Sequence, residues 1–412
     1  MKIAYFTDTF APELNGVTNT LSRLQEHLER KNVQYAFFAP EYNRQSASVF
    51  QNKNVHRFRG ITTALSPESR LAFPGRREIF DRCDTFRPDL VHVVTEFGIG
   101  YRGVKYARSR SLPLVMSYHT DYCKYLRFFH LDFLKPLAEN YLSRLYRSAH
   151  KILAPSRHTL EQLFQKRYQN LGIWSRGIDA EKFNPRFRSQ SLRRQLGLSG
   201  KFVFLYVGRL SPEKGLDMPL CAAEKIESRF PGKTAFVFTG GGPCGDLIRQ
   251  KHFPNVILTG FKTGRELSRL YASADCFAFP SGTETFGNAP LEAMASGLPV
   301  AGVASGGVTE FLFHGKNALL CADGDTNAFT DNLITIMTDE TLRLKLAGNG
   351  RKMARSRTWS TIFDDLLSVY SGLITDNRNL SPNAERPGKL PPETERGIPA
   401  GDVSGGGYRD AS

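Results

Sequence analysis

The chain contains 412 residues, of which 41% are hydrophobic, and it carries a formal net charge of +15 at pH 7. This length and apolar content are enough to bury the cores of two domains. No apolar run approaches the roughly 18 residues that a membrane-spanning helix needs, and Asp8 interrupts the apolar start; both features argue against a spanning helix and a secretory signal.

The six cysteines are scattered along the chain without any C-x-x-C pair. Paired spacing of that kind is typical of zinc sites, and disulfides belong to oxidising compartments. We therefore expect free thiols in a reducing cytoplasm and no zinc site.

The positive charge is concentrated between Arg102 and Lys151, where ten basic residues stand against three acidic ones and alternate with aromatic residues. Charge of this kind fits nucleic acid, phosphate-bearing ligands or an acidic membrane surface. The aromatic residues suit anionic lipid head groups, although an ordinary solvated face gives the same pattern. No nucleic-acid-binding module is recognisable, so no nucleic-acid partner is predicted.

The first half of the chain alternates short apolar runs with stretches of helical spacing. The runs that predict strands are Lys2–Phe6, Val33–Phe38, Leu90–Val94, Leu114–Ser117 and Ile152–Ala154. This alternation predicts a mostly parallel sheet covered by helices on both faces.

Two loops that follow these strands are candidate ligand sites. The polar loop after the first strand ends at Gly16, and a helix is expected from Val17, an arrangement that suits a phosphate but also an ordinary connecting turn. His119 follows the strand Leu114–Ser117, where open α/β sheets place ligands. A lone histidine is also a common structural residue, so its position alone assigns no role.

The second half repeats the alternation. Its predicted strands are Phe202–Val207, Ala235–Phe238, Val256–Thr259, Asp275–Phe279, Leu298–Gly302 and Asn317–Cys321. Arg209 and Lys214 lie five residues apart in the loop after the first of these strands. Two such cations can converge on one diphosphate, the arginine as a planar fork and the lysine as a point charge, or can simply belong to a solvated turn.

The segment Phe279–Val300 reads as a loop followed by a short helix, because Pro290 suits a first helical turn and Gly297 suits a helix end. Glu284 would then precede the helix and Glu292 would lie on it, roughly 12 Å apart if the whole interval were helical. Glycosidase carboxylate pairs are separated by about 5–9.5 Å. We therefore expect two hydrogen-bonding groups for opposite ends of one long polar ligand.

The backbone N–H groups between these two carboxylates form part of the same prediction. They belong to Phe286, Gly287 and Asn288, at the expected start of the helix. A helix N-terminus attracts anions, so these groups are expected to face an anionic part of the ligand.

The string FPSGTETFGNAPLEAMASGLPV resembles the motif of two glutamates separated by seven residues in retaining glycosyltransferases of family 4. The Arg209 and Lys214 loop is similar to the Gly-Arg-Leu and Lys-Gly motif of that family, and His119-Thr120 is similar to its His-Thr pair. The resemblance implies an α/β fold of two doubly wound Rossmann-like domains facing across a cleft, known as GT-B.

The implied organisation has four parts. Residues 1–175 form the acceptor-side domain, residues 176–357 form the nucleotide-sugar-binding domain, and residues 358–376 form a helix that returns to the first domain. Residues 377–412 lose apolar content and are predicted to be disordered.

The resemblance also implies roles for individual residues. Arg209 and Lys214 would hold the donor pyrophosphate, Glu284 the sugar hydroxyls and Glu292 the ribose, while His119 would contact the sugar from the opposite domain. The predicted catalytic residues are His119, Arg209, Lys214 and Glu284. The predicted donor-binding residues are Gly16, Arg209, Lys214, Gly260, Phe261, Lys262, Glu284, Phe286, Gly287, Asn288 and Glu292, with residues 260–262 placed against the nucleobase.

The strings DTFAPELNGVTNTL, SYHTDY and SRGID most resemble GDP-mannose-dependent α-mannosyltransferases, which act on lipid or glycan acceptors. The alternatives are a UDP-sugar-dependent glucosyl- or sulfoquinovosyl-diacylglycerol synthase, an epimerase or hydrolase on the same fold, and an inactive binding protein. The nucleotide-sugar is a co-substrate, and no metal or cofactor is expected because two cations serve the pyrophosphate. The expected location is the cytoplasm, on the inner face of a membrane. Arg176 lies in a segment that resembles the interdomain crossing and receives no role.

Overall fold

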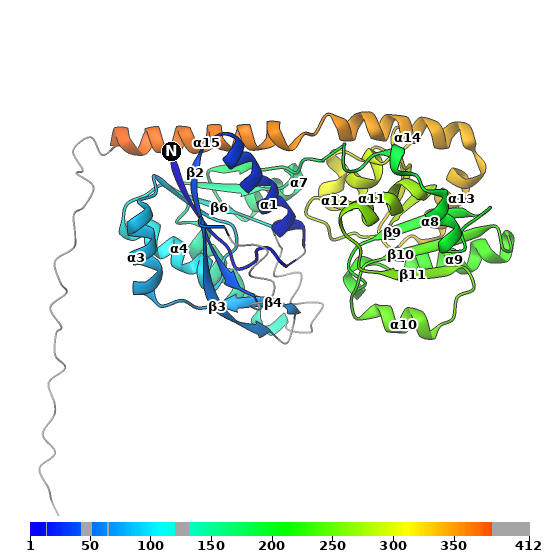
Figure 1. Cartoon of the computed structure of the whole chain (residues 1–412), viewed down its shortest axis with the longest axis horizontal. Helices are drawn as coiled ribbons and strands as arrows, with labels where there is room; N and C mark the ends of the chain where they lie inside the picture. Colours follow the sequence, from blue (N-terminus) through cyan, green and yellow to red (C-terminus); the bar gives the residue numbers. More distant parts are fainter. Residues whose placement is uncertain (14, 43–51, 64–65, 120–131, 381–412) are drawn as a thin grey trace, which may run out of the picture.

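The computed structural model describes residues 1–13, 15–42, 52–63, 66–119 and 132–380. Two α/β domains, each built on one sheet, lie side by side, and a long C-terminal helix runs along the first of them (Figure 1). Among the described helices, none combines the length and apolar composition needed to cross a bilayer. Five of the cysteines are free thiols, and Cys123 lies outside the described residues.

The first domain contains an eight-stranded sheet in the order β4-β3-β2-β1-β5-β6-β7-β8. Its strands are β1 Lys2–Phe6, β2 Gln34–Glu41, β3 Val55–Thr63, β4 Ser66–Ala72, β5 Leu90–Val93, β6 Leu114–Ser117, β7 Lys151–Ala154 and β8 Leu171–Ile173. Its helices are α1 Gly16–Arg30, α3 Arg76–Phe86, α4 Gly98–Ser109, α6 Lys135–Tyr146 and α7 Arg157–Gln165, with a 3-10 turn at η1 Asp132–Leu134. Neighbouring strands are parallel except β3 and β4, which are antiparallel.

All five strands predicted for this domain are present, with ends shifted by up to three residues. The outer strands β3, β4 and β8 were not predicted. β3 and β4 carry charged side chains among their apolar ones, and β8 has only three residues. Strands at or next to a sheet edge, as these are, lack the continuous apolar run of a strand that is buried on both faces.

Helix α1 begins at Gly16, because the Asn15 side chain accepts hydrogen bonds from the backbone N–H groups of Val17 and Thr18, both at 2.9 Å. An asparagine in this position satisfies N–H groups that have no partner within the helix. The helix packs Leu21, Leu24 and Leu28 against the sheet, as the spacing of these residues predicts.

The second domain contains a six-stranded, fully parallel sheet in the order β11-β10-β9-β12-β13-β14. Its strands are β9 Phe202–Val207, β10 Thr234–Thr239, β11 Val256–Gly260, β12 Cys276–Phe279, β13 Val300–Val303 and β14 Ala318–Cys321. Its helices are α8 Gln190–Gln195, α9 Asp217–Arg229, α10 Cys244–Gln250, α11 Gly264–Ser273, α12 Asn288–Ala295, α13 Thr326–Thr338 and α14 Glu340–Arg355. The 3-10 turns are η2 Pro185–Phe187, η3 Pro212–Lys214 and η4 Gly306–Glu310.

Both sheets follow the doubly wound order, so the predicted fold class is confirmed. The six strands predicted for the second domain are all present. Helix α12 begins at Asn288, so Pro290 lies in its first turn as expected, and Gly297 follows its end with φ +80°.

The C-terminal helix α15 spans Trp359–Leu380 and returns to the first domain, as predicted. It buries Phe363, Leu366, Tyr370 and Ile374 in the core between the first sheet and α1. In Figure 1 it continues the line of α14 along the same side of the molecule. The helix also includes residues 377–380, which we had placed in the tail; residues 381–412 lie outside the described part.

Candidate active site

The candidate site forms where the strand order of the second sheet reverses, between β9 and β12. In open parallel sheets, ligands bind beyond the carboxyl ends of the strands at such a point. The loop after β9 carries Arg209 and Lys214, and the loop after β12 carries Glu284. Gly215, with φ +64°, allows these loops to meet, since a Cβ there would lie 2.8 Å from the carbonyl oxygen of Pro280.

Lys214 and Glu284 form an ion pair, with Lys214 Nζ at 2.6 Å from Glu284 Oε1. The sequence predicted both residues in one site but assigned the lysine to pyrophosphate and the glutamate to sugar. Here each is the partner of the other, and both are partly exposed. From this position the Lys214 ammonium group can contact both Glu284 and an anionic ligand.

Arg209 is exposed, and its guanidinium group makes no hydrogen bond or ion pair with any described residue. Its backbone carbonyl accepts a hydrogen bond of 2.8 Å from the Tyr206 hydroxyl, which fixes the start of the loop. The loop thus presents an uncommitted planar donor five residues from Lys214.

The loop from Glu284 to Asn288 is held by close backbone packing. Gly306 and Gly307 of η4 lie beneath it, since a Cβ on either would approach within 2.2 Å of the carbonyl oxygen of Glu284 or Thr285. The Gly307 N–H donates to the Glu284 carbonyl at 2.9 Å. Phe286 is buried against Phe311, with ring centroids 5.2 Å apart.

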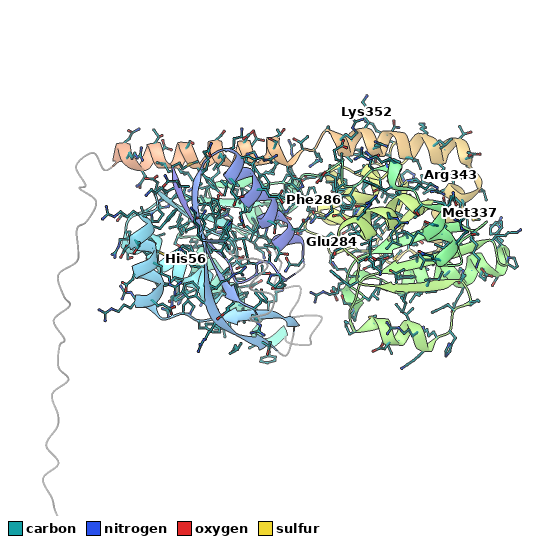
Figure 2. The ribbon with its side chains drawn as sticks, viewed as in Figure 1. His56, Glu284, Phe286, Met337, Arg343 and Lys352 are labelled. Atoms are coloured by element: carbon teal, nitrogen blue, oxygen red, sulfur yellow. The ribbon has the colours of Figure 1, made fainter. Side chains whose placement is uncertain are left out.

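The N–H groups of residues 286–288 donate to no described residue, as expected at the start of α12. Glu284 and Phe286 lie on the side of the second domain that faces the first (Figure 2). The loop is therefore held in place by packing and has backbone N–H groups that are not used within the described protein.

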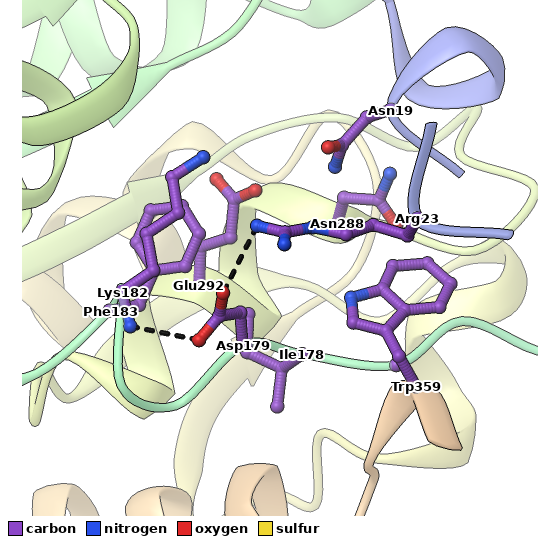
Figure 3. Close-up of a pocket in the computed structure, with 10 residues that line it drawn as sticks. Asn19, Arg23, Ile178, Asp179, Lys182, Phe183, Asn288, Glu292 and Trp359 are labelled. Carbon is purple, nitrogen blue, oxygen red and sulfur yellow. Dashed lines mark hydrogen bonds and ion pairs between the residues drawn. The ribbon is translucent and has the colours of Figure 1, made fainter. Parts of the chain in front are cut away.

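Glu292 occupies the second turn of α12 and accepts a hydrogen bond of 2.9 Å from the Tyr271 hydroxyl through Oε2. Burial raises the pKa of Glu292 to about 7, and the Tyr271 hydrogen bond opposes this shift. Figure 3 shows Glu292 in a narrow crevice that has a cavity volume of about 10 Å³ and is lined from both domains. Its lining residues include Asn19 and Arg23 of α1.

Gly16 brings the first domain close to α12. A Cβ on Gly16 would lie 3.1 Å from Asn288 Nδ2. The first turn of α1 and the first turn of α12 therefore approach each other. The prediction that Gly16 binds the same donor as Asn288 requires the two residues to be close.

His119 reaches the same junction from the end of β6. Its backbone carbonyl accepts a hydrogen bond of 3.2 Å from Thr285 Oγ1, next to Glu284. Its ring Nδ1 lies 2.7 Å from Arg176 Nη2. Burial, followed by the positive charge of Arg176, holds the pKa of His119 well below its usual range.

Comparison with known sequences identifies the family. The model of "Glycosyltransferase Family 4" matches residues 14–182, and that of "Glycosyl transferases group 1" matches residues 188–353. A GDP-mannose-dependent alpha-mannosyltransferase of Mycobacterium tuberculosis is 30% identical over 380 residues, covering 90% of this chain and 97% of that protein. The chain is a family 4 glycosyltransferase.

Two further relatives extend the comparison. A sulfoquinovosyl transferase of Arabidopsis thaliana is 32% identical over 309 residues, which cover 73% of this glycosyltransferase and 58% of the plant protein. The crystal structure of Anabaena HepE in complex with UDP has a TM-score of 0.73 at 20% identity, covering 90% of this chain and 100% of that one. At this sequence identity, the structural similarity shows that the two proteins share a fold and nothing further.

The glycosyltransferase does not gather every predicted residue in one place. Gly260 ends β11, an outer strand of the second sheet, and Phe261 and Lys262 follow it; Phe261 is exposed. Lys262 Nζ lies 3.8 Å from Glu266 Oε2. The contact of these three residues with a nucleobase stays a prediction.

Two buried residues of the glycosyltransferase were not assigned from the sequence. Asp8 follows β1 and accepts hydrogen bonds from Thr95 Oγ1 at 2.9 Å and from the Ile99 N–H at 2.8 Å, so it caps α4; burial raises its pKa to about 6. The position of Asp8 just beyond a buried strand is the signal in the sequence that could have indicated it. Arg176 pairs with His119, a contact that no local pattern could reveal.

Within the described ranges, no three His, Cys, Asp or Glu side chains gather as a metal-binding group. The residues that the sequence predicts to face a donor pyrophosphate are cations and backbone N–H groups. Metal independence of this glycosyltransferase therefore stays a prediction.

Proposed function

We propose that this glycosyltransferase moves a hexose from a nucleotide-diphosphate-sugar to a lipid or glycan acceptor, with GDP-mannose as the first candidate donor. The observation that carries this proposal is the pairing of Lys214 with Glu284 at the reversal point, opposite His119 of the first domain. A cation, a carboxylate and an imidazole from two domains suit a ligand that has both an anionic part and hydroxyl groups.

In the proposed mechanism, the bond between the sugar and the diphosphate breaks, and negative charge grows on the diphosphate. The acceptor hydroxyl oxygen bonds to the sugar, and the departing diphosphate takes the hydroxyl proton. Lys214, Arg209 and the N–H groups before α12 are fixed donors that would stabilise this charge as it develops. Glu284 would orient the sugar through its hydroxyls, and Glu292 would hold the ribose. When the diphosphate draws Lys214 toward itself, Glu284 gains freedom to bind the sugar.

The donor is tested by thermal unfolding with free nucleotides. A ligand at about 100 times its Kd adds about 2.7 kcal/mol to the free energy of unfolding, so the nucleotide of the donor raises Tm. We expect a shift with GDP and none with UDP at the same concentration. The mycobacterial relative supports GDP-mannose. A shift with UDP alone would favour a UDP-sugar donor, as in the alternative of a glucosyl- or sulfoquinovosyl-diacylglycerol synthase.

A product assay separates transfer from the other chemistries considered for this fold. Incubation of GDP-mannose with lipid or glycan extracts should give a mannosylated product that requires the acceptor. Release of free mannose at the same rate without acceptor would indicate a hydrolase, and a changed sugar on the nucleotide an epimerase. Activity should persist in EDTA, and its loss there would contradict metal-independent catalysis.

A lipid acceptor is supported by the exposed apolar side chains of the first domain. Phe133 of η1 and Leu137 of α6 are 74% and 69% exposed, on either side of Lys135. Apolar and basic groups together suit an anionic bilayer surface, which fits the expected place on the inner face of a membrane. The rest of the aromatic and basic stretch, residues 120–131, lies outside the described part.

Membrane association is tested by sedimentation with vesicles. We expect the protein to bind vesicles that contain anionic lipid and not neutral ones, and Phe133→Ser with Leu137→Ser should weaken this binding. Leu344→Ser is the matched control, because Leu344 is an exposed apolar residue on α14 of the second domain. Equal binding to neutral vesicles, or an equal effect of the control, would contradict the proposal.

A further inference from the structure

Arg176 is a buried guanidinium group in the segment that joins the two domains, and it is only 5% exposed. Its Nη1 donates to the carbonyl oxygens of Trp174 at 2.9 Å and Ser175 at 3.2 Å. Its Nη2 lies 2.7 Å from His119 Nδ1. The Trp174 ring contacts both groups, with its centroid 5.2 Å from Arg176 Cζ and 5.4 Å from the His119 ring centroid.

The contact between Arg176 and His119 fixes where the imidazole proton resides. A guanidinium group has only donors, so His119 Nδ1 must be the acceptor and must carry no proton. In a neutral imidazole the proton then lies on Nε2. A second proton on Nδ1 would place two N–H groups and two positive charges against each other.

The Nε2 atom of His119 is the unexplained group. It is buried and has no hydrogen-bond partner among the described residues. A buried donor without a partner is unfavourable and uncommon in folded proteins, so it calls for a reason. The His119 backbone is bonded to Thr285, beside Glu284, so the ring lies where the first domain meets the proposed donor site.

We infer that Arg176 is a positioning residue that holds His119 as the neutral Nε2–H tautomer. His119 then donates a hydrogen bond to the nucleotide-sugar through Nε2 and never acts as a general base. This inference rests on the proposed function. An Nε2 that already carries its proton has no free lone pair to accept another one. The proton of the acceptor hydroxyl therefore goes to a group other than His119.

The other titratable group that acts on His119 is His92, and the side chains of both histidines are buried. His92 bonds to Tyr370 OH at 2.5 Å through Nδ1 and to Ser117 Oγ at 2.6 Å through Nε2. Burial lowers the pKa of His92 to about 3, so it stays neutral near pH 7. Arg176 is thus the charged group that lowers the pKa of His119.

A double-mutant cycle tests whether Arg176 acts through His119. We expect Arg176→Met to lower kcat/KM for the donor about tenfold or more, the typical effect of losing one hydrogen bond to a charged group. In a His119→Ala background the same change should cost less than about twofold, because the partner is already gone. Fully additive losses would overturn the inference.

The protonation state is measured without any substrate, by the pH dependence of ¹⁵N signals from labelled histidines, with His119 assigned by its loss in His119→Gln. In the wild type we expect His119 to stay neutral with its proton on Nε2 from pH 5 to 8. Arg176→Met should move the pKa of His119 upward, and Arg176→Lys, which keeps a cationic donor, should move it less. Titration of wild-type His119 near pH 6.5 would overturn the inference even if the donor proves to be another sugar.

A third comparison covers the case in which Arg176→Met fails to fold. The amide nitrogen of glutamine can replace Nε2 of histidine, and that of asparagine can replace Nδ1. His119→Gln should therefore retain at least about tenfold more activity than His119→Asn. Equal losses in both variants would contradict the role of Nε2 as the donor. Absence of any turnover in the wild type, with the signals unchanged, would refute the proposed function alone.

Discussion

Replacement of Glu292 by glutamine should remove a pH dependence from the free energy of unfolding. The carboxyl group has a pKa of about 7 in the folded protein and an unperturbed value of 4.5, because burial on α12 disfavours its ionised form. Between these two values the folded state keeps a proton that the unfolded state releases. The unfolded state therefore gains relative stability as the pH rises through this window.

The shift sets the size of the effect. At 1.36 kcal/mol per pKa unit, the difference between the folded and unfolded pKa values corresponds to about 3 kcal/mol. The ionisation of Glu292 lowers the free energy of unfolding by this full amount above pH 7 and has no such effect below pH 4.5. Glu292 is partly exposed in the crevice, so solvent screening reduces this value, and we expect about 1–3 kcal/mol. Glu292→Gln should thus match the wild type at pH 4.5 and become more stable than it at pH 8.

Urea unfolding of both proteins at several pH values measures this difference directly. Glu266→Gln on α11 is the matched control, because the Glu266 side chain is 71% exposed and stays in water in both states. Its stability difference from the wild type should not change with pH. Parallel pH profiles for the wild type and Glu292→Gln would refute the argument that burial governs this carboxyl group.

Four further substitutions test the core, the loop and the division of roles. Phe363→Ala should cost about 3–5 kcal/mol and lower Tm by several degrees, because this fully buried ring anchors α15 to the first domain; an unchanged Tm would contradict that anchoring. Gly287→Ala should lose stability and nucleotide-induced thermal shift, because φ is +95° and the new Cβ would lie 2.5 Å from Val308 Cγ1; full nucleotide binding would show that the loop can adapt. Glu284→Gln should lower kcat far more than it raises KM for the donor, whereas Glu292→Ala should mainly raise KM, and equal effects on both parameters would contradict the assigned roles.

The elements that the sequence predicted well are those whose signals are local. The strand from Phe202 to Val207 is a continuous apolar run, and it has the predicted bounds. The end of α12 just before Gly297 follows from a glycine in the left-handed conformation. The start of α12 at Asn288 agrees with the expectation that Pro290 lies in the first helical turn.

The elements that escaped prediction depend on the surroundings rather than on their own sequence. Strand β3 contains three arginine or histidine side chains and is recognised only through its pairing with β2 and β4. The contact between Arg176 and His119 joins residues 57 positions apart, and no spacing rule applies across that separation. The same is true of Thr285 and the His119 carbonyl, which lie 166 positions apart.

By itself, the sequence determined the alternation of strands and helices, the loops that carry Arg209, Lys214 and Glu284, the helix that carries Glu292, and the family. Apolar period, turn residues and motif spacing act within a few residues, so the linear order contains them. Only the tertiary structure decided that Lys214 pairs with Glu284 across 70 positions and that Gly16 faces Asn288. Those contacts arise from the strand order of the sheets and from the packing of one domain against the other, to which residues along the whole chain contribute.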